Sequence, residues 1–590
     1  MVRAMPKRSG PAYVVTTTRH YNGKVYHSHL LRRSYRDGNT VRNETLGNLS
    51  HLPDPIIDLI RRSLKGETFV PAGDAFAVTQ SRLHGHVQAV TQAMHKLGFA
   101  GLLASRSCRE RDLIQALVAA RILAPHTKLA TIRWWANTTL AEAFSVEDAD
   151  EQELYAAMDW LLERQDRIQK KLAARHLKAG GTALYDLSSS YYEGATCPLA
   201  RRGYSRDGKK GTLQVNYGLL TDARGCPTAV SVYEGDTADP ATLAPEIERL
   251  KRAFAIDQFV IVADRGMISQ KAVSVLKAQS GVDWITALKS VSIRALVEQG
   301  TIQLDLFDER NLFELTSPDY PGERLIACRN PDLARLRAHK RDDLLDATEA
   351  NLVKIQARVA AGRLTGQDRI ALAVGKIINQ YKVAKHFALD ITDTAFTFSR
   401  ILDKIAAEAA LDGVYVIRTS LPAAHLSAPD CVRGYKALSR VERAFRTLKS
   451  VDLRIRPIHH RLADRVRAHI FLCMLAYYVE WHMREAWAPL TFTDEDQAAK
   501  ATRDPVAPAG RSPDALRKVR HHRLDDGSPA HSFATLLASL TTITRNTCRT
   551  PGANPDHAPD QADDAASFQI NTIASPHQQR ALDLIDTITP

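Results

Sequence analysis

The sequence predicts an α/β protein whose central domain is built on a mixed β-sheet, preceded by a small β-meander and a helical block. Three observations predict this class. Short apolar strands and amphipathic helices alternate between residues 182 and 288, hairpin turn residues punctuate the first 50 residues, and helical periods fill residues 80–178. With 590 residues the chain should contain several structural units, because single cores stop growing near roughly 250–300 residues.

The first segment is expected to be a three-stranded meander. Residues 12–50 alternate β-forming and polar residues, with turn signals at Tyr-Asn-Gly (21–23) and Arg-Asp-Gly-Asn (36–39). The block that follows, up to residue 178, is rich in Ala, Leu and Arg and repeats its apolar residues with a helical period. It therefore predicts a helical bundle.

The central domain is predicted from five strands and a helix. The strands are expected at 182–187, 212–219, 228–233, 258–263 and 284–288, and the helix at 240–254. Three antiparallel strands, a helix and then further strands are typical of an α/β domain on a mixed sheet.

Residues 291–412 depart from this succession of strands and helix and are interpreted as an inserted subdomain. Short strands such as IQLDLF and a long charged helix near 330–363 are expected in it. A strand at 413–420 returns to the main sheet, and helices follow at about 433–450 and 461–487. Beyond Thr493 the sequence is polar. The stretch NPDHAPDQADDAA (554–566) is expected to be disordered, and HQQRALDLI (577–585) is amphipathic.

The charge and composition of the chain limit the classes of function that it can have. The chain has 79 Lys and Arg against 66 Asp and Glu, a net charge of +13, which favours nucleic acid as partner before a membrane surface; a basic protein without a specific polyanionic partner is the alternative. No apolar segment follows the basic N-terminus, and the longest apolar run is shorter than a membrane span. The seven cysteines form no CxxC pair, so neither a zinc ribbon nor a disulfide framework is indicated. We expect a cytoplasmic protein.

Two carboxylates stand where predicted buried strands end. Asp264 follows the strand 258–263 and precedes Arg265 and Gly266, and Asp186 ends the strand 182–187. Strand-end carboxylates at one sheet edge can share a hard divalent ion such as Mg²⁺. The alternative is that Asp264 belongs to an ordinary turn after a core strand.

A third acid lies in the helix expected at 433–450. Tyr435 and Lys449 each lie seven residues from Glu442, close to two helical turns, so the three project from one face. A third carboxylate would complete a two-metal site. The alternative is an amphipathic helix that buries Leu438 and Phe445 and leaves Glu442 in solvent. A P-loop and a G-x-S-x-G elbow are absent from the sequence.

Together these segments resemble bacterial DDE transposases of the insertion-sequence-four superfamily. The stretches that carry the resemblance, over roughly residues 12–490, are YDLSSSYYEG, the segment from GYSRDGKKG to GDTADPATL, VIVADRGMIS, DGVYVIRTS and the Y-x2-R-x3-E-x6-K signature. Tyr435, Glu442 and Lys449 match that signature in identity and spacing. Leu438 stands in place of its Arg, which puts one DNA contact in doubt.

The resemblance implies a ribonuclease-H-like core with a β-rich insertion, and a site in which Asp186, Asp264 and Glu442 are the catalytic metal ligands. Two Mg²⁺ ions, replaceable by Mn²⁺, would be held there. It also implies that Tyr435 and Lys449 hold phosphates of the transposon end. Further basic residues are expected to contact DNA, with a mobile, solvated hairpin as the alternative for the loop 201–211: Arg440, Arg446, Arg265, Arg201, Arg202, Arg206, Lys209 and Lys210.

The expected organisation has six parts. They are a β-meander (1–75), a helical DNA-binding domain (76–178), the core's first part (179–290), the insertion (291–412), the core's second part (413–490) and a partly disordered C-terminal region (491–590). The implied activity is cut-and-paste transposition by a homodimer on terminal inverted repeats and target DNA, with no membrane involved. A metal-dependent nuclease that does not join strands and a silent DNA-binding protein are the alternatives.

Overall fold

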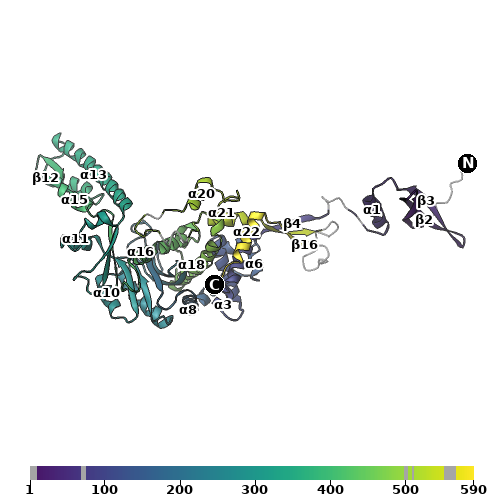
Figure 1. Cartoon of the computed structure of the whole chain (residues 1–590), viewed down its shortest axis with the longest axis horizontal. Helices are drawn as coiled ribbons and strands as arrows, with labels where there is room; N and C mark the ends of the chain where they lie inside the picture. Colours follow the sequence, from purple (N-terminus) through teal and green to yellow (C-terminus); the bar gives the residue numbers. More distant parts are fainter. Residues whose placement is uncertain (1–9, 68, 70–74, 497–502, 508–509, 550–566) are drawn as a thin grey trace. The chain divides into compact units, whose positions relative to one another are not determined.

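The chain forms two compact units (Figure 1). The computed structural model describes residues 10–67, 69, 75–496, 503–507, 510–549 and 567–590. The first unit combines Met1–Ser81 with Asn546–Ile570, and the second combines Arg82–Arg545 with Asn571–Pro590. The segment 554–566, which the sequence predicts to be disordered, lies outside the described residues.

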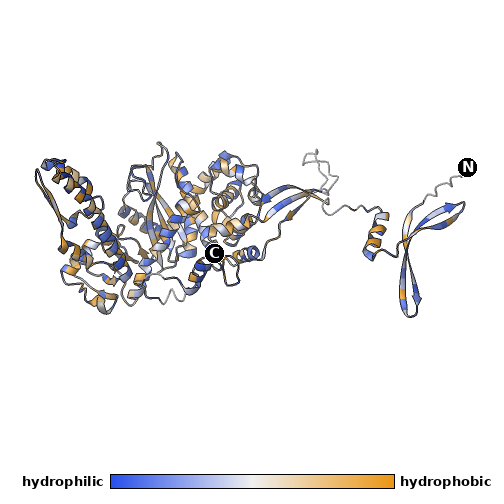
Figure 2. Cartoon of the chain, turned by 90° about the horizontal axis from the view of Figure 1, so that it is seen from above, coloured by the Kyte–Doolittle hydropathy of each residue, from blue (hydrophilic) through white to orange (hydrophobic). Residues whose placement is uncertain are grey.

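The first unit contains the predicted meander. Strands β1 (Ala12–Tyr21), β2 (Lys24–Asp37) and β3 (Thr40–Asn48) pair in antiparallel order β1-β2-β3. The first hairpin turns at Asn22 and Gly23, both with positive φ, as expected of an Asn-Gly turn. The three-stranded prediction is confirmed. Helix α1 (Asp54–Leu64) follows, and Figure 2 shows hydrophobic residues along it.

A second small sheet has the order β16-β15-β4. Its strands are β4 (Ala77–Leu83), β15 (Thr544–Arg549) and β16 (Ser567–Asn571). The predicted amphipathic piece near the end of the chain is helix α22 (Pro576–Ile585), which begins with a capping box at Ser575 and buries Leu582 and Ile585.

The predicted helical block is present in the second unit. It consists of α2 (Gly85–Lys96), α3 (Phe99–Leu103), α4 (Arg109–Leu123), α5 (Lys128–Trp135), α6 (Leu140–Ala143), α7 (Glu151–Leu162) and α8 (Gln165–His176). Helix α7 begins with a capping box formed by Asp150 and Glu153, which satisfies its first free N–H groups. The block packs against the long helix α18 (Ala463–Ala486) through α4 and α7.

The centre of the second unit is an eight-stranded mixed sheet of order β10-β11-β14-β9-β8-β5-β6-β7. β5 pairs in parallel with β8, and β8 with β9, while the other neighbours are antiparallel. The mixed-sheet α/β prediction is therefore confirmed. The strands are β5 (Thr182–Tyr191), β6 (Gln214–Asp222), β7 (Pro227–Glu234), β8 (Phe259–Val262), β9 (Val282–Ala287), β10 (Leu312–Leu315), β11 (Arg324–Arg329) and β14 (Val414–Thr419).

Both faces of this sheet are covered, which explains its nearly continuous apolar strands. Tyr185 and Leu187 of β5 pack in one cluster with α9 (Asp239–Glu248) and α10 (Gln270–Lys277). Leu184, on the opposite face, packs in the large core that includes α17 (Leu438–Arg446) and α18. Because side chains alternate along a strand, Asp186 lies on the same face as Leu184.

The inserted segment differs from the predicted β-rich subdomain. β10 and β11 belong to the main sheet, and IQLDLF leads into helix α12 (Leu306–Glu309) instead of forming a strand. The remainder is mostly helical: α13 (Pro331–Ala360), α14 (Gln367–Ile378) and α15 (Leu402–Ala409) accompany one hairpin, β12 (Phe387–Ile391) with β13 (Phe396–Arg400). Short apolar runs do not distinguish strand from helix, and IQLDLF is the run expected as a strand whose end is helical here. The long charged helix expected near 330–363 is present as α13.

The helix predicted at 433–450 is divided. It consists of α16 (Ala428–Lys436), α17, and a π-helical turn η4 (Thr447–Val451). Helix α18 matches the predicted apolar helix at 461–487. Among the described residues, no helix has the length and apolar character to cross a membrane.

Candidate active site

Sheet register brings the first two predicted carboxylates together. In the parallel pair of β5 and β8, Leu184 lies opposite Val262. Asp186 and Asp264 each lie two residues beyond this pair, on the same face and at the same level of the sheet. The prediction that Asp186 ends its strand is wrong, because β5 continues through Tyr191. Asp264 does follow the last residue of β8.

Helix α17 supplies the third carboxylate. It packs against β5 by burying Leu438, Val441 and Phe445, and the Phe445 ring meets Tyr217 of β6 with centroids 5.8 Å apart. Glu442 is exposed to solvent, as the amphipathic-helix alternative expected. It nevertheless faces the cavity that Asp186 and Asp264 line. Leu438, which replaces the signature Arg, is buried and belongs to the core.

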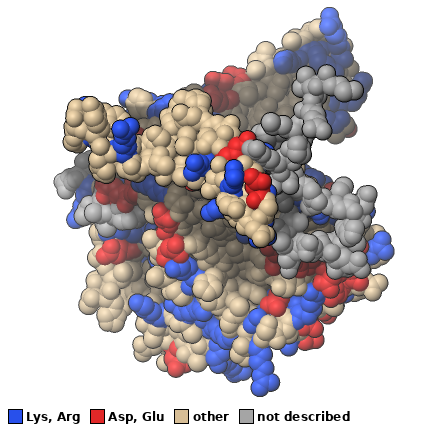
Figure 3. Space-filling view, turned by 90° about the vertical axis from the view of Figure 1, so that its right-hand side faces the viewer, with Lys and Arg blue, Asp and Glu red and all other residues tan. Residues whose placement is uncertain are grey.

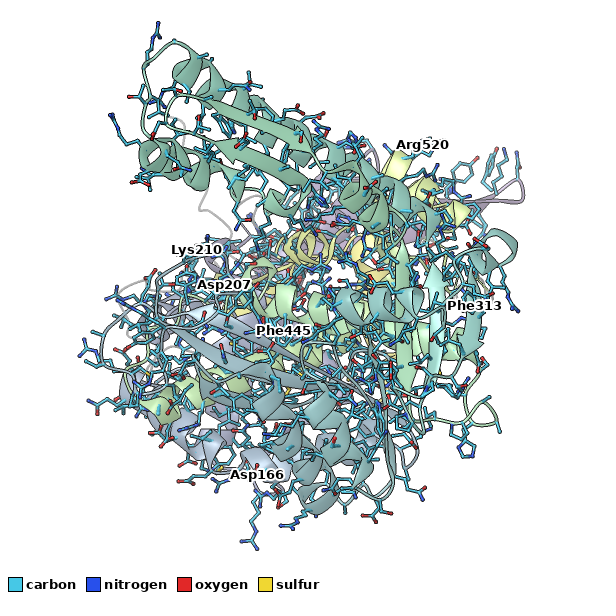
Figure 4. All side chains as sticks on the ribbon, turned by 90° about the vertical axis from the view of Figure 1, so that its left-hand side faces the viewer. Asp166, Asp207, Lys210, Phe313, Phe445 and Arg520 are labelled. Carbon is cyan, nitrogen blue, oxygen red and sulfur yellow. The ribbon has the colours of Figure 1, made fainter. Side chains whose placement is uncertain are left out.

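The three carboxylates line one open cavity of about 480 Å³. Figure 4 labels Asp207 and Phe445, which line this cavity, and Lys210 on the neighbouring loop. The remaining lining residues are Leu187, Ser188, Tyr204, Arg206, Asp239, Met267, Arg446, Lys449, Ser450 and Arg456. The cavity therefore combines an acidic floor with several cations.

Burial and neighbouring negative charge perturb Asp186. Burial, with a smaller contribution from the charges of Asp264 and Glu442, raises its pKa to about 7. A hydrogen bond from the Leu187 N–H to Asp186 Oδ1 (2.8 Å) and the charge of Arg206 oppose that rise. The three carboxylates thus form a concentration of negative charge suited to a cation, and oxygen donors of this kind suit Mg²⁺.

Asp264 is oriented by two donors. The Tyr435 hydroxyl donates to Asp264 Oδ1 at 3.2 Å, and the Gly266 N–H donates to Asp264 Oδ2 at 3.4 Å. Burial raises the pKa of Tyr435, with Asp264 as a second cause, so the phenol stays a donor. Tyr435 therefore reaches the site from α16, on the other side of the break that separates it from Glu442.

Asp207 is a functional candidate that sequence reasoning missed. Its side chain is 1% exposed, and its Oδ1 accepts a hydrogen bond from Lys449 Nζ at 2.9 Å and pairs with Arg456. Its Oδ2 accepts the Tyr191 N–H at 3.0 Å. The predicted phosphate contact Lys449 is thus paired with a buried carboxylate. The signal in the sequence was one acid in the otherwise basic loop RRGYSRDGKKG.

Asp239 is a further acid of the cavity that sequence reasoning missed. It is the first residue of α9 and forms an ion pair with Arg206. The Arg206 N–H donates to Ser189 Oγ at 3.1 Å, which fixes the loop against β5. An Asp-Pro pair opening a helix was the available signal, although it also marks ordinary helix starts.

The other predicted DNA contacts fall into three groups. Arg446 lines the active-site cavity, and Arg265 lines a neighbouring cavity of about 490 Å³ together with Tyr435. On the loop, Arg202 and Lys210 are exposed. Lys209 Nζ lies 3.5 Å from the centroid of the Tyr191 ring. Arg201 Nε lies 3.6 Å from Glu234 Oε2. Arg440 donates to the Ala223 carbonyl, so it fastens α17 to the β6–β7 turn.

Basic side chains also extend beyond the two cavities. Figure 3 shows places on the drawn face where Lys and Arg gather. Lys128, at the start of α5, is instead buried. Its side chain is 5% exposed, and burial lowers its pKa to about 7.

Comparison with known proteins identifies the class. The transposase DDE domain family matches residues 179–479, and the N-terminal domain of IS1634 family transposases matches residues 14–72. The comparison with curated proteins gave no match. A cryo-electron microscopy structure titled as a piggyBac transposase synaptic complex with hairpin DNA aligns with 81% of this chain and 86% of that one, at 9% identity and a TM-score of 0.32. A likeness at that score supports no inference about this chain.

The chain belongs to the DDE transposase family, since the domain match covers more than half of it, and it is a transposase of the insertion-sequence type. Transposases of this family are enzymes that cleave and transfer DNA strands with the help of divalent metal ions. The predicted class and activity are confirmed, and DNA is the partner of the reaction.

Proposed function

We propose that this transposase excises its element and joins it to target DNA through one site in which Asp186, Asp264 and Glu442 hold two Mg²⁺ ions. The observation that carries the proposal is the convergence of these carboxylates, from β5, the end of β8 and α17, on one cavity. When bound, the ions supply activation of the attacking oxygen and stabilisation of the leaving oxygen in an in-line displacement at phosphorus.

The chain's own residues hold the carboxylates in position. Asp186 is fixed on a paired strand and by the Leu187 N–H, and Asp264 is fixed by the Tyr435 hydroxyl and the Gly266 N–H. Glu442 is held by the packing of Phe445 and Val441 against the sheet. Rigid positioning of the three carboxylates is needed for a fast reaction, because a catalytic group misplaced by about 1 Å can lower the rate about a hundredfold.

Cations around the cavity are assigned to DNA phosphates. Arg446 and Arg206 line it, and Arg206 is also held by Asp239. Arg202, Lys209 and Lys210 on the adjoining loop, together with Arg201 and Arg265, extend the basic surface. Lys449 reaches phosphate from its place beside Asp207, which sets its position. Contacts of this kind fix the register of DNA without reading its sequence.

Recognition of the transposon ends and assembly of the protein on them are proposed from the sequence. We assign recognition of the terminal inverted repeats to the helical block 76–178 and the meander 1–75, and paired-end assembly to a homodimer. We also propose a division into a core (179–290 and 413–490), an insertion (291–412) whose strands β10 and β11 join the core sheet, and a C-terminal region (491–590). Mn²⁺ would replace Mg²⁺, because both accept carboxylate oxygens.

The test is a supercoiled plasmid that carries the element's ends, incubated with Mg²⁺ and a second plasmid as target. Wild type and Asp264→Asn are compared, with Asp257→Asn, at an exposed aspartate that lies outside the cavity, as the matched control. We expect excision and joining by wild type and control, and neither by Asp264→Asn. Cleavage without joining would identify a nuclease. A salt-sensitive gel shift without cleavage by any of the three proteins would identify a DNA-binding protein only.

A further inference from the structure

Two histidines and a cysteine meet at a place that the transposase chemistry does not use. His176 is the last residue of α8, Cys226 lies in the turn between β6 and β7, and His482 belongs to α18. One ligand atom from each lies within 4.8 Å of the other two. These residues come from three separate parts of the chain, so only folding brings them together.

The geometry suits a metal ion. Cys226 Sγ lies 3.8 Å from His482 Nε2, and the rings of His176 and His482 have centroids 5.6 Å apart. Around a tetrahedral zinc ion, with Zn–S near 2.3 Å and Zn–N near 2.0–2.1 Å, a sulfur and a nitrogen lie about 3.5 Å apart. Cys226 is 0% exposed and unpaired with any other cysteine, and His482 is 7% exposed. His176 is partly buried.

The donors are held in place by their neighbours. Asp222 Oδ1 accepts the N–H groups of Arg224 (2.8 Å) and Cys226 (2.9 Å), so the turn presents the thiol in a fixed direction. The Tyr478 hydroxyl, one helical turn before His482, lies 3.1 Å from His176 Nε2. Outer contacts of this kind orient ligands in metal sites.

We propose that His176, Cys226 and His482 bind one zinc-class divalent ion, with water in the fourth position. One thiolate and two imidazoles form a donor set of intermediate softness, which Zn²⁺ accepts and Mg²⁺ does not. Binding forms one metal–sulfur bond, and the thiol proton leaves to solvent. With three protein ligands, the affinity is expected to be lower than that of a closed four-ligand site.

The ion would join three parts of the molecule near the catalytic helix. The same turn accepts a hydrogen bond at the Ala223 carbonyl from Arg440, two residues before Glu442. A Cβ added at Gly225 would lie 2.8 Å from the Cβ of Arg440, so turn and helix touch without spare room. The ion would therefore link α8, the turn between β6 and β7, and α18. It would lie next to the turn that Arg440 of α17 contacts.

The test uses Co²⁺ as a spectroscopic probe on the reduced, metal-free full chain carrying Asp264→Asn, which weakens ion binding at the carboxylates. A thiolate ligand gives Co²⁺ an intense near-ultraviolet charge-transfer band that oxygen ligands do not give. We expect this band to saturate at one Co²⁺ per chain and to disappear on addition of Zn²⁺. Zn²⁺ should also raise the melting temperature.

Two variants and a control decide the assignment. Cys226→Ser should abolish the band and the melting shift, whereas Cys197→Ser, at another buried cysteine, should keep both. If Cys226→Ser does not fold, His482→Gln serves instead and should weaken Co²⁺ binding at least tenfold. Absence of the band in the folded parent protein, or its persistence in Cys226→Ser, would overturn the proposal. Either result is independent of transposition, because no DNA is present.

Discussion

Because the pKa of Asp186 is raised, the affinity of the site for a divalent ion should depend on pH around neutrality. An aspartate with an ordinary pKa would give no pH dependence in that range. With a pKa of about 7, Asp186 is about nine-tenths ionised at pH 8 and about one-tenth at pH 6. A divalent ion needs the ionised form, so its affinity should fall about tenfold, or about 1.4 kcal/mol, from pH 8 to pH 6. An aspartate with the usual pKa of 3.8 would give an unchanged affinity.

The assay is calorimetric titration of Mn²⁺ into the DNA-free protein at pH 6, 7 and 8. Asp186→Asn should bind too weakly to measure, and Asp257→Asn should reproduce the wild-type profile. Equal wild-type affinity at pH 6 and pH 8 would refute the reasoning, because it would mean that burial and the neighbouring charges do not hold a proton on Asp186.

The same shift has a consequence for stability in the absence of ions. A carboxyl group whose pKa is higher in the folded than in the unfolded state destabilises the fold as pH rises from the unfolded value, 3.8, to the folded value, about 7. The rise corresponds to at most about 4 kcal/mol. Asp186→Asn should therefore melt at a higher temperature than wild type at pH 8 in EDTA, and the difference should vanish near pH 4.

Three further substitutions test the surroundings of the site. Tyr435→Phe removes the hydrogen bond to Asp264 and should slow cleavage at saturating DNA by up to about tenfold, the value of one hydrogen bond of about 0.5–1.5 kcal/mol. Asp207→Asn leaves Lys449 and Arg456 without their buried carboxylate and should destabilise the second unit by about 3–5 kcal/mol; an unchanged melting temperature would contradict this. Gly225→Ala places a Cβ against Arg440 at φ +89° and should cost about 1–3 kcal/mol, measured by denaturant unfolding against Gly208→Ala, where φ is also positive but no atom lies nearby.

The sequence by itself determined the elements and the class. Alternation and Asn-Gly turn chemistry predicted the meander, and helical periodicity predicted the block before the core. Apolar runs predicted the strand that carries Asp186 and the strand that leads to Asp264. These are local properties, because a strand buried on both faces or a two-residue turn is specified by neighbouring residues. The motifs that resembled DDE transposases led to the family, which the domain match confirms.

Only the tertiary structure decided which groups meet. Register between β5 and β8 placed Asp264 beside Asp186, and the sheet recruited β10 and β11 from a segment that looked like a separate β-rich insertion. Asp207 pairs with Lys449, 242 residues away, and His176 meets His482. Such long-range contacts leave no periodic signal in a single sequence, because they depend on how packed elements are aligned and not on the residues beside each partner.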